Sequence, residues 1–193
     1  MTKKLAIIGF STATSRPNPW PDAETEVWGF NELYRVYDPT LYRFTRWFEL
    51  HIRSYFSNPE WHAHALFLNR LLDLGVTVYL PKRDAAVIRS KFYPRAKVAA
   101  LSPHGEYHAG SFDWMVALAI AEGFTEITLY GVDFAGGGEP ISARACLEYW
   151  LGVAEGRGIV TRVVGGDVFR IFHLTRSDTP YGFAPFRLVQ EAS

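Results

Sequence analysis

One segment constrains the fold of this chain more than any other: a stretch with helical character that is apolar on every side and leads into an apolar strand. Residues 110–123 carry hydrophobic side chains around the whole helical circumference, which is typical of a helix buried inside a protein. Residues 127–133, which end in Gly-Val-Asp, follow after a short connection and predict a buried parallel strand. The segment therefore predicts an α/β fold, in which ligands bind beyond the carboxyl ends of the strands.

The rest of the chain alternates between strand and helix patterns in the same way. Strands are predicted at 5–9, 26–31, 45–51, 76–81, 97–101 and 158–164, and helices at 59–75, 83–92 and 140–156. Residues 166–193 have a less regular pattern interrupted by prolines, so they predict an edge strand or tail rather than another strand–helix unit. The order of elements predicts a single α/β domain over residues 1–193 with a mostly parallel sheet.

The composition excludes several classes of protein. A chain of 193 residues, 48% of them hydrophobic, suits one domain with a substantial core. Its 20 basic and 20 acidic residues balance, so the positive charge of proteins that hold nucleic acid through its phosphates is missing, and bulk nucleic-acid binding is not expected. The single cysteine, Cys146, cannot form an intramolecular disulfide, and no apolar run suits a signal peptide or a membrane span. We expect a cytoplasmic protein with no membrane association.

Polar side chains follow four of the predicted strands. They are Ser11, Thr12 and Thr14 after the first strand, Asn31 after the second, Glu49 and His51 at the end of the third, and Asp133 after the strand that follows the buried helix. The buried helix begins at Gly110 and Ser111, and helix N-termini bind anions. Because parallel strands end at a common edge, we expect these groups to form a pocket for a phosphate or ribose. Turn formation and helix capping are the alternative for each residue alone.

The loop after the first strand lacks the standard nucleotide motifs. Residues 9–15 read Gly-Phe-Ser-Thr-Ala-Thr-Ser, which is neither the Gly-x-Gly-x-x-Gly of dinucleotide-binding folds nor the Gly-Lys-Ser/Thr of a P-loop. Conventional NAD binding and P-loop ATP hydrolysis are therefore disfavoured. Further along, Gly136–Gly138 predicts a mobile loop, which is able to act as a lid.

Histidines supply the candidates for acid–base chemistry. His104 and His108 flank Glu106 in the loop before the buried helix, and His51 follows the acidic Glu49. Imidazole titrates near neutral pH, so each of these histidines is a candidate general base. The group at 104–108 lacks the cysteine pair of zinc deaminases and the His-Glu-x-x-His of zincins, so no metal site is predicted.

Other polar residues have simpler interpretations. His62 and His64 are two residues apart on a predicted helix, so they face different directions, and both are predicted at the surface with no shared metal site. Asp113 is near the start of the buried helix, where a carboxylate stabilises the helix dipole, and we prefer this role to ligand contact.

Several segments resemble known families. The run from Gly110 through Ile127 to Phe134 is similar to a segment of two related groups that share a Rossmann-like domain. One group is the bacterial CMP-sialic acid sialyltransferases of the Campylobacter type, and the other is the flagellin-glycosylation and archaeal pterin-diphosphokinase-like proteins. Residues 7–15 resemble their first strand and nucleotide loop, and residues 27–34 resemble their strand ending in Asn. The order Trp-Gly-x-Asn, Trp-Phe-Glu-x-His, Gly-Val-Asp also resembles small tailed-phage proteins.

The resemblance implies a single Rossmann-like nucleotide-binding domain with helices on both faces of the sheet. It places Gly9, Ser11 and Asn31 near the phosphates and sugar of a nucleotide, and Ser111 beneath the leaving nucleotide; Thr12 and Gly110 belong to the same predicted binding set. The sialyltransferases carry their general base in a histidine segment after the Gly-hydrophobic-Asp strand. Residues 134–158 contain no histidine, so sialyl transfer by that mechanism is not predicted.

The predicted function is a glycosyltransferase-like transfer from a nucleotide-activated sugar. Candidates for the acid or base are His51, His104, His108, Glu49 and Asp133. One alternative is a phage-type protein, in the cytoplasm of a bacterial host, that binds or sequesters a nucleotide signal without turning it over. A weaker alternative is diphosphokinase-like phosphoryl transfer, which needs metal-binding carboxylates such as Asp133 and Glu139. The expected ligand is a small nucleotide, and the sequence predicts no oligomeric state.

Overall fold

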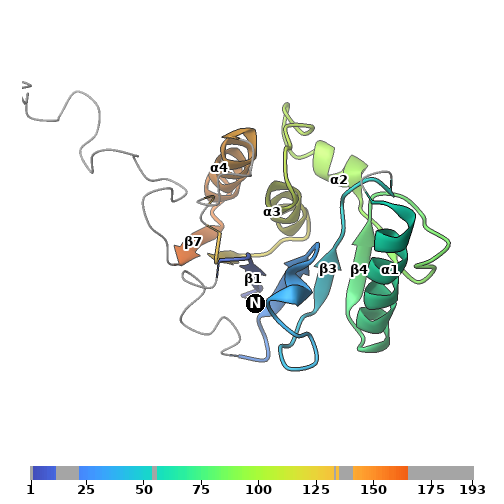
Figure 1. Cartoon of the computed structure of the whole chain (residues 1–193). Coiled ribbons are helices and arrows are strands. Elements are labelled where there is room, and N and C mark those ends of the chain that lie inside the picture. The colour runs from blue at the N-terminus through green and yellow to red at the C-terminus, as the bar shows by residue number, and fades with distance from the viewer. Residues whose placement is uncertain (1, 12–21, 54–55, 133, 135–140, 165–193) are drawn as a thin grey trace, which may run out of the picture.

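A seven-stranded sheet, parallel at every pairing, forms the centre of the computed structural model, which describes residues 2–11, 22–53, 56–132, 134 and 141–164 (Figure 1). The strands are β1 (Lys4–Ile8), β2 (Glu26–Phe30), β3 (Arg46–Phe48), β4 (Thr77–Leu80), β5 (Lys91–Phe92), β6 (Glu126–Tyr130) and β7 (Val160–Val164). The helices are α1 (Asn58–Asp73), α2 (Arg95–Ala99), α3 (Ser111–Ala121) and α4 (Ile141–Glu155), with a 3₁₀ turn η1 (Leu33–Arg35). The predicted α/β fold is confirmed, while the predicted tail at 166–193 lies outside the described residues.

The strand order places a ligand site at a defined position on the sheet. The order is β5-β4-β3-β2-β1-β6-β7, so the chain moves outward from β1 to one edge and then returns to pair β6 with the other side of β1. Open parallel sheets bind ligands where the strand order reverses, beyond the carboxyl ends of the strands. In this sheet that position is beside the ends of β1, β2 and β6.

Alternate residues of each strand face opposite layers of helices. On β1, Leu5 and Ile7 belong to a core cluster that contains most of the buried residues of α3 and α4. Ala6 and Ile8 belong to a second cluster that contains Trp61, Ala65, Leu68 and Leu71 of α1. Figure 1 shows α3 and α4 side by side, with α1 apart from them beside β4. The sheet is therefore covered on both faces, which explains why its central strands are mainly apolar.

Helix α3 is the apolar helix that the sequence predicts, and its first turn fixes one wall of the site. The carboxylate of Asp113 accepts hydrogen bonds from the backbone N–H groups of Ala109 (2.7 Å), Gly110 (3.0 Å) and Trp114 (2.7 Å). This confirms the preferred interpretation of Asp113 as a residue that stabilises the start of the helix. None of the helices in the described part of the chain is long and apolar enough to cross a membrane.

The predictions of two short elements are wrong. The expected helix at 83–92 is a series of turns followed by β5, because Asp84 accepts a hydrogen bond from the N–H of Ala86 and Ser90 donates to the carbonyl of Val87. Such local side-chain bonds compete with a helix. The expected strand at 97–101 is instead the second half of α2 and the turn after it. The arginine, alanines and lysine of α2 favour a helix, and a short apolar run does not specify a strand.

Candidate functional site

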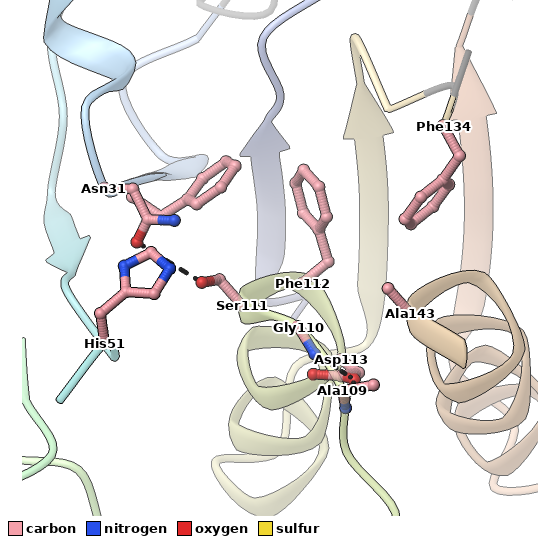
Figure 2. Close-up of a pocket in the computed structure, with 10 residues that line it drawn as sticks. Asn31, His51, Ala109, Gly110, Ser111, Phe112, Asp113, Phe134 and Ala143 are labelled. Carbon is pink, nitrogen blue, oxygen red and sulfur yellow. Dashed lines mark hydrogen bonds between the residues drawn. The ribbon is translucent and has the colours of Figure 1, made fainter. Parts of the chain in front are cut away.

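A pocket of about 170 Å³ lies beyond the carboxyl ends of β2 and β6, at the start of α3 (Figure 2). It is lined by Phe30, Asn31, His51, Ala109, Gly110, Ser111, Phe112, Asp113, Phe134 and Ala143. Asn31 comes from the end of β2, His51 follows β3, and Gly110 and Ser111 begin α3. The structure thus brings together four of the residues that the sequence analysis singles out.

Two residues that line this pocket have left-handed backbone. Asn31 has φ 46° and Phe134 has φ 53°; within the described residues these are the only non-glycine positions with positive φ, and both line the pocket. Asn31 is held in this conformation by hydrogen bonds from its N–H to the carbonyl of Phe48 (2.9 Å) and from Trp47 Nε1 to its own carbonyl (3.1 Å). Left-handed backbone is uncommon for residues other than glycine, although asparagine tolerates it better than phenylalanine does, and such positions cluster at functional sites.

The start of α3 supplies groups that suit an anion. Ser111 Oγ donates a 3.5 Å hydrogen bond to Asn31 Oδ1, so the two side chains face each other across the pocket. Asp113 already accepts from the N–H groups of Ala109 and Gly110. The next two N–H groups, of Ser111 and Phe112, have no partner within a helix by their position in the first turn. A phosphate at this point would meet these N–H groups and the Ser111 hydroxyl.

His51 is the imidazole at this pocket, and a buried carboxylate holds it. Its Nδ1 lies 2.8 Å from Glu49 Oε1, and its backbone N–H donates to the same oxygen at 3.0 Å. The Glu49 side chain is 0% exposed, whereas that of His51 is 36% exposed. The hydrogen bond to Glu49 raises the pKa of His51 above its ordinary value of 6.5, and burial opposes this effect only in part. With Nδ1 turned to Glu49, the opposite edge of the ring, which carries Nε2, points away from the carboxylate.

The other oxygen of Glu49 meets a second histidine. Oε2 lies 2.8 Å from Nε2 of His64, on α1, at an ion-pair distance but without the angle of a regular hydrogen bond. The Tyr34 hydroxyl is 3.2 Å from His64 Nδ1. Burial alone would raise the pKa of Glu49, but the contacts with His51 and His64 outweigh it and lower that pKa. An ionised, buried carboxylate is thus shared between two imidazoles.

The prediction that His64 lies at the surface is wrong. Its side chain is only 2% exposed, whereas His62 is exposed as predicted. The sequence does carry a signal for this difference, since His64 falls in helical phase with Trp61, Ala65 and Leu68, the buried face of α1. A polar residue inside an apolar helical stripe indicates a buried partner.

Gly9, directly after β1, has a structural role at the end of the sheet. A Cβ on Gly9 would lie 2.2 Å from the carbonyl oxygen of Gly131, and the N–H of Ser11 donates to that oxygen at 3.1 Å. Gly9 therefore allows β1 and β6 to end in close contact. Neither Gly9 nor Ser11 is among the residues that line the pocket. Thr12, Asp133 and Gly136–Gly138 lie outside the described residues.

The loop before α3 places its histidines away from the pocket lining. His108 has a side chain that is 2% exposed and is stacked between the rings of Trp114 and Trp150, with centroid distances of 3.4 and 4.9 Å. Its Nδ1 is 3.5 Å from Asp113 Oδ1. His104 is exposed, with its ring 6.2 Å from that of Tyr149. The expectation that this loop delivers a histidine to the common edge is therefore not met at this pocket.

A second pocket, of about 200 Å³, shares His51 with the first. It lies between the segments that follow β3 and β4 and is lined by His51, Ile52, Arg53, Trp61, Leu80, Pro81, Lys82, Arg83 and Asp84. The guanidinium of Arg53 lies over the ring of Trp61 at 5.3 Å and donates to the carbonyl of Phe56 and to Asn58. Of the residues that line these two pockets, His51 alone lines both.

The fold has counterparts among solved structures. The sialyltransferase CST-II in complex with a trisaccharide acceptor and CMP matches with a TM-score of 0.60 at 16% identity, over 84% of this chain and 81% of that chain. The CstII sialyltransferase from Campylobacter jejuni in complex with cytidine-5'-monophosphate matches with a TM-score of 0.58 at 16% identity, over 85% and 80% of the two chains. The sequence itself matches no protein-family model and no curated protein. The chain thus has the Rossmann-like fold of these sialyltransferases.

Proposed function

We propose that this protein transfers a sugar from a nucleotide-activated donor to an acceptor hydroxyl, with His51 as the acid–base residue. The observation that carries the proposal is the position of His51, held by buried Glu49 where two pockets meet. A transferase must bring two substrates to one proton-transfer group, and this geometry provides such a point. The likeness to solved sialyltransferases that hold CMP supports a nucleotide as the donor's leaving group.

The first pocket suits the nucleotide end of the donor. Asn31 and Ser111 offer an amide and a hydroxyl for the ribose and phosphate, and the first turn of α3 offers N–H groups for the phosphate charge. Because these groups stabilise the negative charge that develops as the sugar–phosphate bond breaks, they promote departure of the nucleotide.

The second pocket suits the acceptor. It has the basic side chains of Arg53, Lys82 and Arg83 against the single acid Asp84, so an acceptor that carries a negative group fits it best. In the transfer, the acceptor oxygen forms a bond to the anomeric carbon while the bond from that carbon to the phosphate oxygen breaks. The acceptor proton passes to His51 Nε2, and Glu49 stabilises the imidazolium that results.

The two alternative functions lack a comparable observation. For a protein that only binds a nucleotide, no feature of the described residues corresponds to the placement of His51 between two pockets. Phosphoryl transfer requires carboxylates that hold a metal ion; Asp133 and Glu139 lie outside the described residues, and within the described ranges no group of three or more acidic, histidine or cysteine side chains is arranged to hold one.

Ligand binding followed by turnover tests the proposal. Thermal unfolding of the full chain is measured with CMP, UDP, GDP and ADP, and the sugar derivative of any nucleotide that raises the melting temperature is then incubated with the protein and a panel of acidic and neutral saccharides. We expect one nucleotide to stabilise the fold and its sugar derivative to release free nucleotide faster when an acceptor is present. His51→Gln should retain binding and lose turnover, whereas His62→Gln, a change at an exposed histidine, should retain both. Stabilisation by none of the nucleotides contradicts the proposal.

A further inference from the structure

We infer that His64 is a positioning residue for His51, acting through Glu49, with Tyr34 fixing the proton on the His64 ring. The four side chains come from η1, α1 and the segment after β3, and they form a continuous series from Tyr34 to His64, Glu49 and His51. The effect of this series on turnover rests on the proposed function, whereas its effect on the His51 ring does not.

The two carboxylate oxygens of Glu49 contact different histidines. Oε1 accepts from both the ring and the backbone of His51, while Oε2 lies 2.8 Å from His64 Nε2. Glu49 is 0% exposed, so loss of His64 would leave an ionised oxygen in the interior without this partner, which is strongly unfavourable. The carboxylate would then take up a proton or turn towards water in the pocket. In either case His51 loses the acceptor that fixes its orientation.

Tyr34 determines which nitrogen of His64 carries the proton. A tyrosine hydroxyl that donates to Nδ1, at 3.2 Å, leaves the His64 proton on Nε2, where it faces Glu49. The neutral His51 ring correspondingly carries its proton on Nδ1, facing Glu49, so that Nε2 has the lone pair that a general base needs. The ring of Phe56 stacks on His64 at a centroid distance of 5.4 Å, so the surroundings are apolar and strengthen these contacts.

Several other ionisable groups act on His51 or line its two pockets, and all of them are unchanged in the variants proposed below. They are Glu32 beside η1, Asp113 across the first pocket, and Arg53, Lys82, Arg83 and Asp84 in the second pocket. Arg35 and Glu32 act on Tyr34. A change in His51 after substitution of His64 therefore reports on the contact with Glu49.

Nitrogen NMR of the histidine rings in the full chain tests this inference without any substrate. His64→Phe keeps a flat ring but removes the donor, His64→Gln keeps an N–H donor at a similar distance along the side chain, and His62→Gln is the matched control on the exposed face of α1. In the wild-type protein and in His62→Gln we expect neutral His51 to hold its proton on Nδ1. His64→Phe should move this proton towards Nε2 and lower the His51 pKa towards 6.5, and His64→Gln should restore most of the wild-type pattern.

A folded His64→Phe variant whose His51 tautomer and pKa equal those of the wild type would overturn the inference. If His64→Phe does not fold, Tyr34→Phe provides the test, because it retains the ring that stacks on Phe67 at 3.8 Å and removes only the hydroxyl. We expect Tyr34→Phe to shift the His51 tautomer in the same direction by a smaller amount. An unchanged tautomer in that variant would also overturn the inference.

Kinetics separate the inference from the proposed function. With an active nucleotide-sugar, His64→Phe should lower kcat by about tenfold and leave the KM for the donor unchanged, since loss of an outer polar partner typically costs this much activity. If no nucleotide-sugar is turned over but the His51 tautomer changes in His64→Phe, the proposed function fails and the positioning role of His64 stands. If the wild-type protein turns over a nucleotide-sugar but the His51 tautomer is the same in His64→Phe, the proposed function stands and the positioning role of His64 fails.

Discussion

Ser111 Oγ and Asn31 Oδ1 are joined by a 3.5 Å hydrogen bond although the two residues are 80 positions apart in the chain. The contact links the start of α3 to the end of β2, two elements that line the first pocket. A ligand phosphate or ribose that enters between them would exchange this long hydrogen bond for shorter ones of its own. Both side chains should therefore contribute to nucleotide affinity.

Removing the Ser111 hydroxyl should weaken nucleotide binding. A hydrogen bond to a charged group is worth about 1.5–3 kcal/mol, so Ser111→Ala should raise the Kd of the bound nucleotide by about tenfold or more, as measured by calorimetric titration. Thr40→Ala, which removes a hydroxyl bonded to Asp38 in an exposed turn, is the control and should leave the Kd unchanged. Equal affinity in Ser111→Ala and wild type would show that the phosphate lies elsewhere.

Two substitutions of Asn31 should distinguish the effect of its backbone conformation on stability from the effect of its side chain on binding. Its φ of 46° suits glycine but not alanine, so Asn31→Ala should lower the free energy of unfolding by about 1–2 kcal/mol, whereas Asn31→Gly should change it much less. Both variants lose the amide and should bind nucleotide more weakly. Urea unfolding and titration of the two variants measure the two effects, and full affinity in Asn31→Gly would exclude a role for the amide in binding.

The transfer rate should rise with pH through the pKa of His51. A general base acts in its neutral form, and the contact with Glu49 raises the pKa of His51 above 6.5, so kcat/KM should be low in acid and level off above that raised pKa. His51→Gln should abolish the rise together with most of the rate. A rate that falls over the same range would assign His51 as an acid.

The raised pKa of His51 also predicts how the stability of the fold changes with pH. Because the folded pKa of His51 is above the unfolded one, its protonation stabilises the fold fully below the unfolded pKa, and this contribution disappears as pH rises through the folded pKa. The wild-type melting temperature should therefore lose this component as the pH rises from 6.5 through the raised pKa of His51, and His51→Gln should show a smaller change. An identical pH dependence in both proteins would contradict the ion pair with Glu49.

Gly9→Ala should destabilise the sheet. The added Cβ would lie 2.2 Å from the Gly131 carbonyl oxygen, so β1 and β6 must separate, at a cost of about 1–3 kcal/mol. Gly152→Ala, in an open position on α4, is the matched control and should stabilise the protein by about 0.5–1 kcal/mol. Denaturant unfolding measures both. A neutral Gly9→Ala would show that the two strand ends are free to move apart.

The long elements and part of the site were predictable because their patterns are local. The apolar circumference of 110–123 and the strand after it reflect burial on all sides, and the structure places α3 and β6 there. Parallel strands necessarily end at one edge, so Asn31, His51 and Ser111 were correctly expected to meet. The short segments 83–92 and 97–101 were not predictable, because a few residues do not establish a period.

The sequence alone therefore determined the class of fold, the edge of the sheet where polar groups gather, and the residue types available there. Only the tertiary structure decided which of those residues meet. His64 and Glu49 are partners because packing of α1 on the sheet brings two positions within 2.8 Å, whereas His108 was removed from the candidate pocket by two tryptophans from α3 and α4. Periodicity specifies which face of an element is buried, but the group that it meets there depends on how the elements pack.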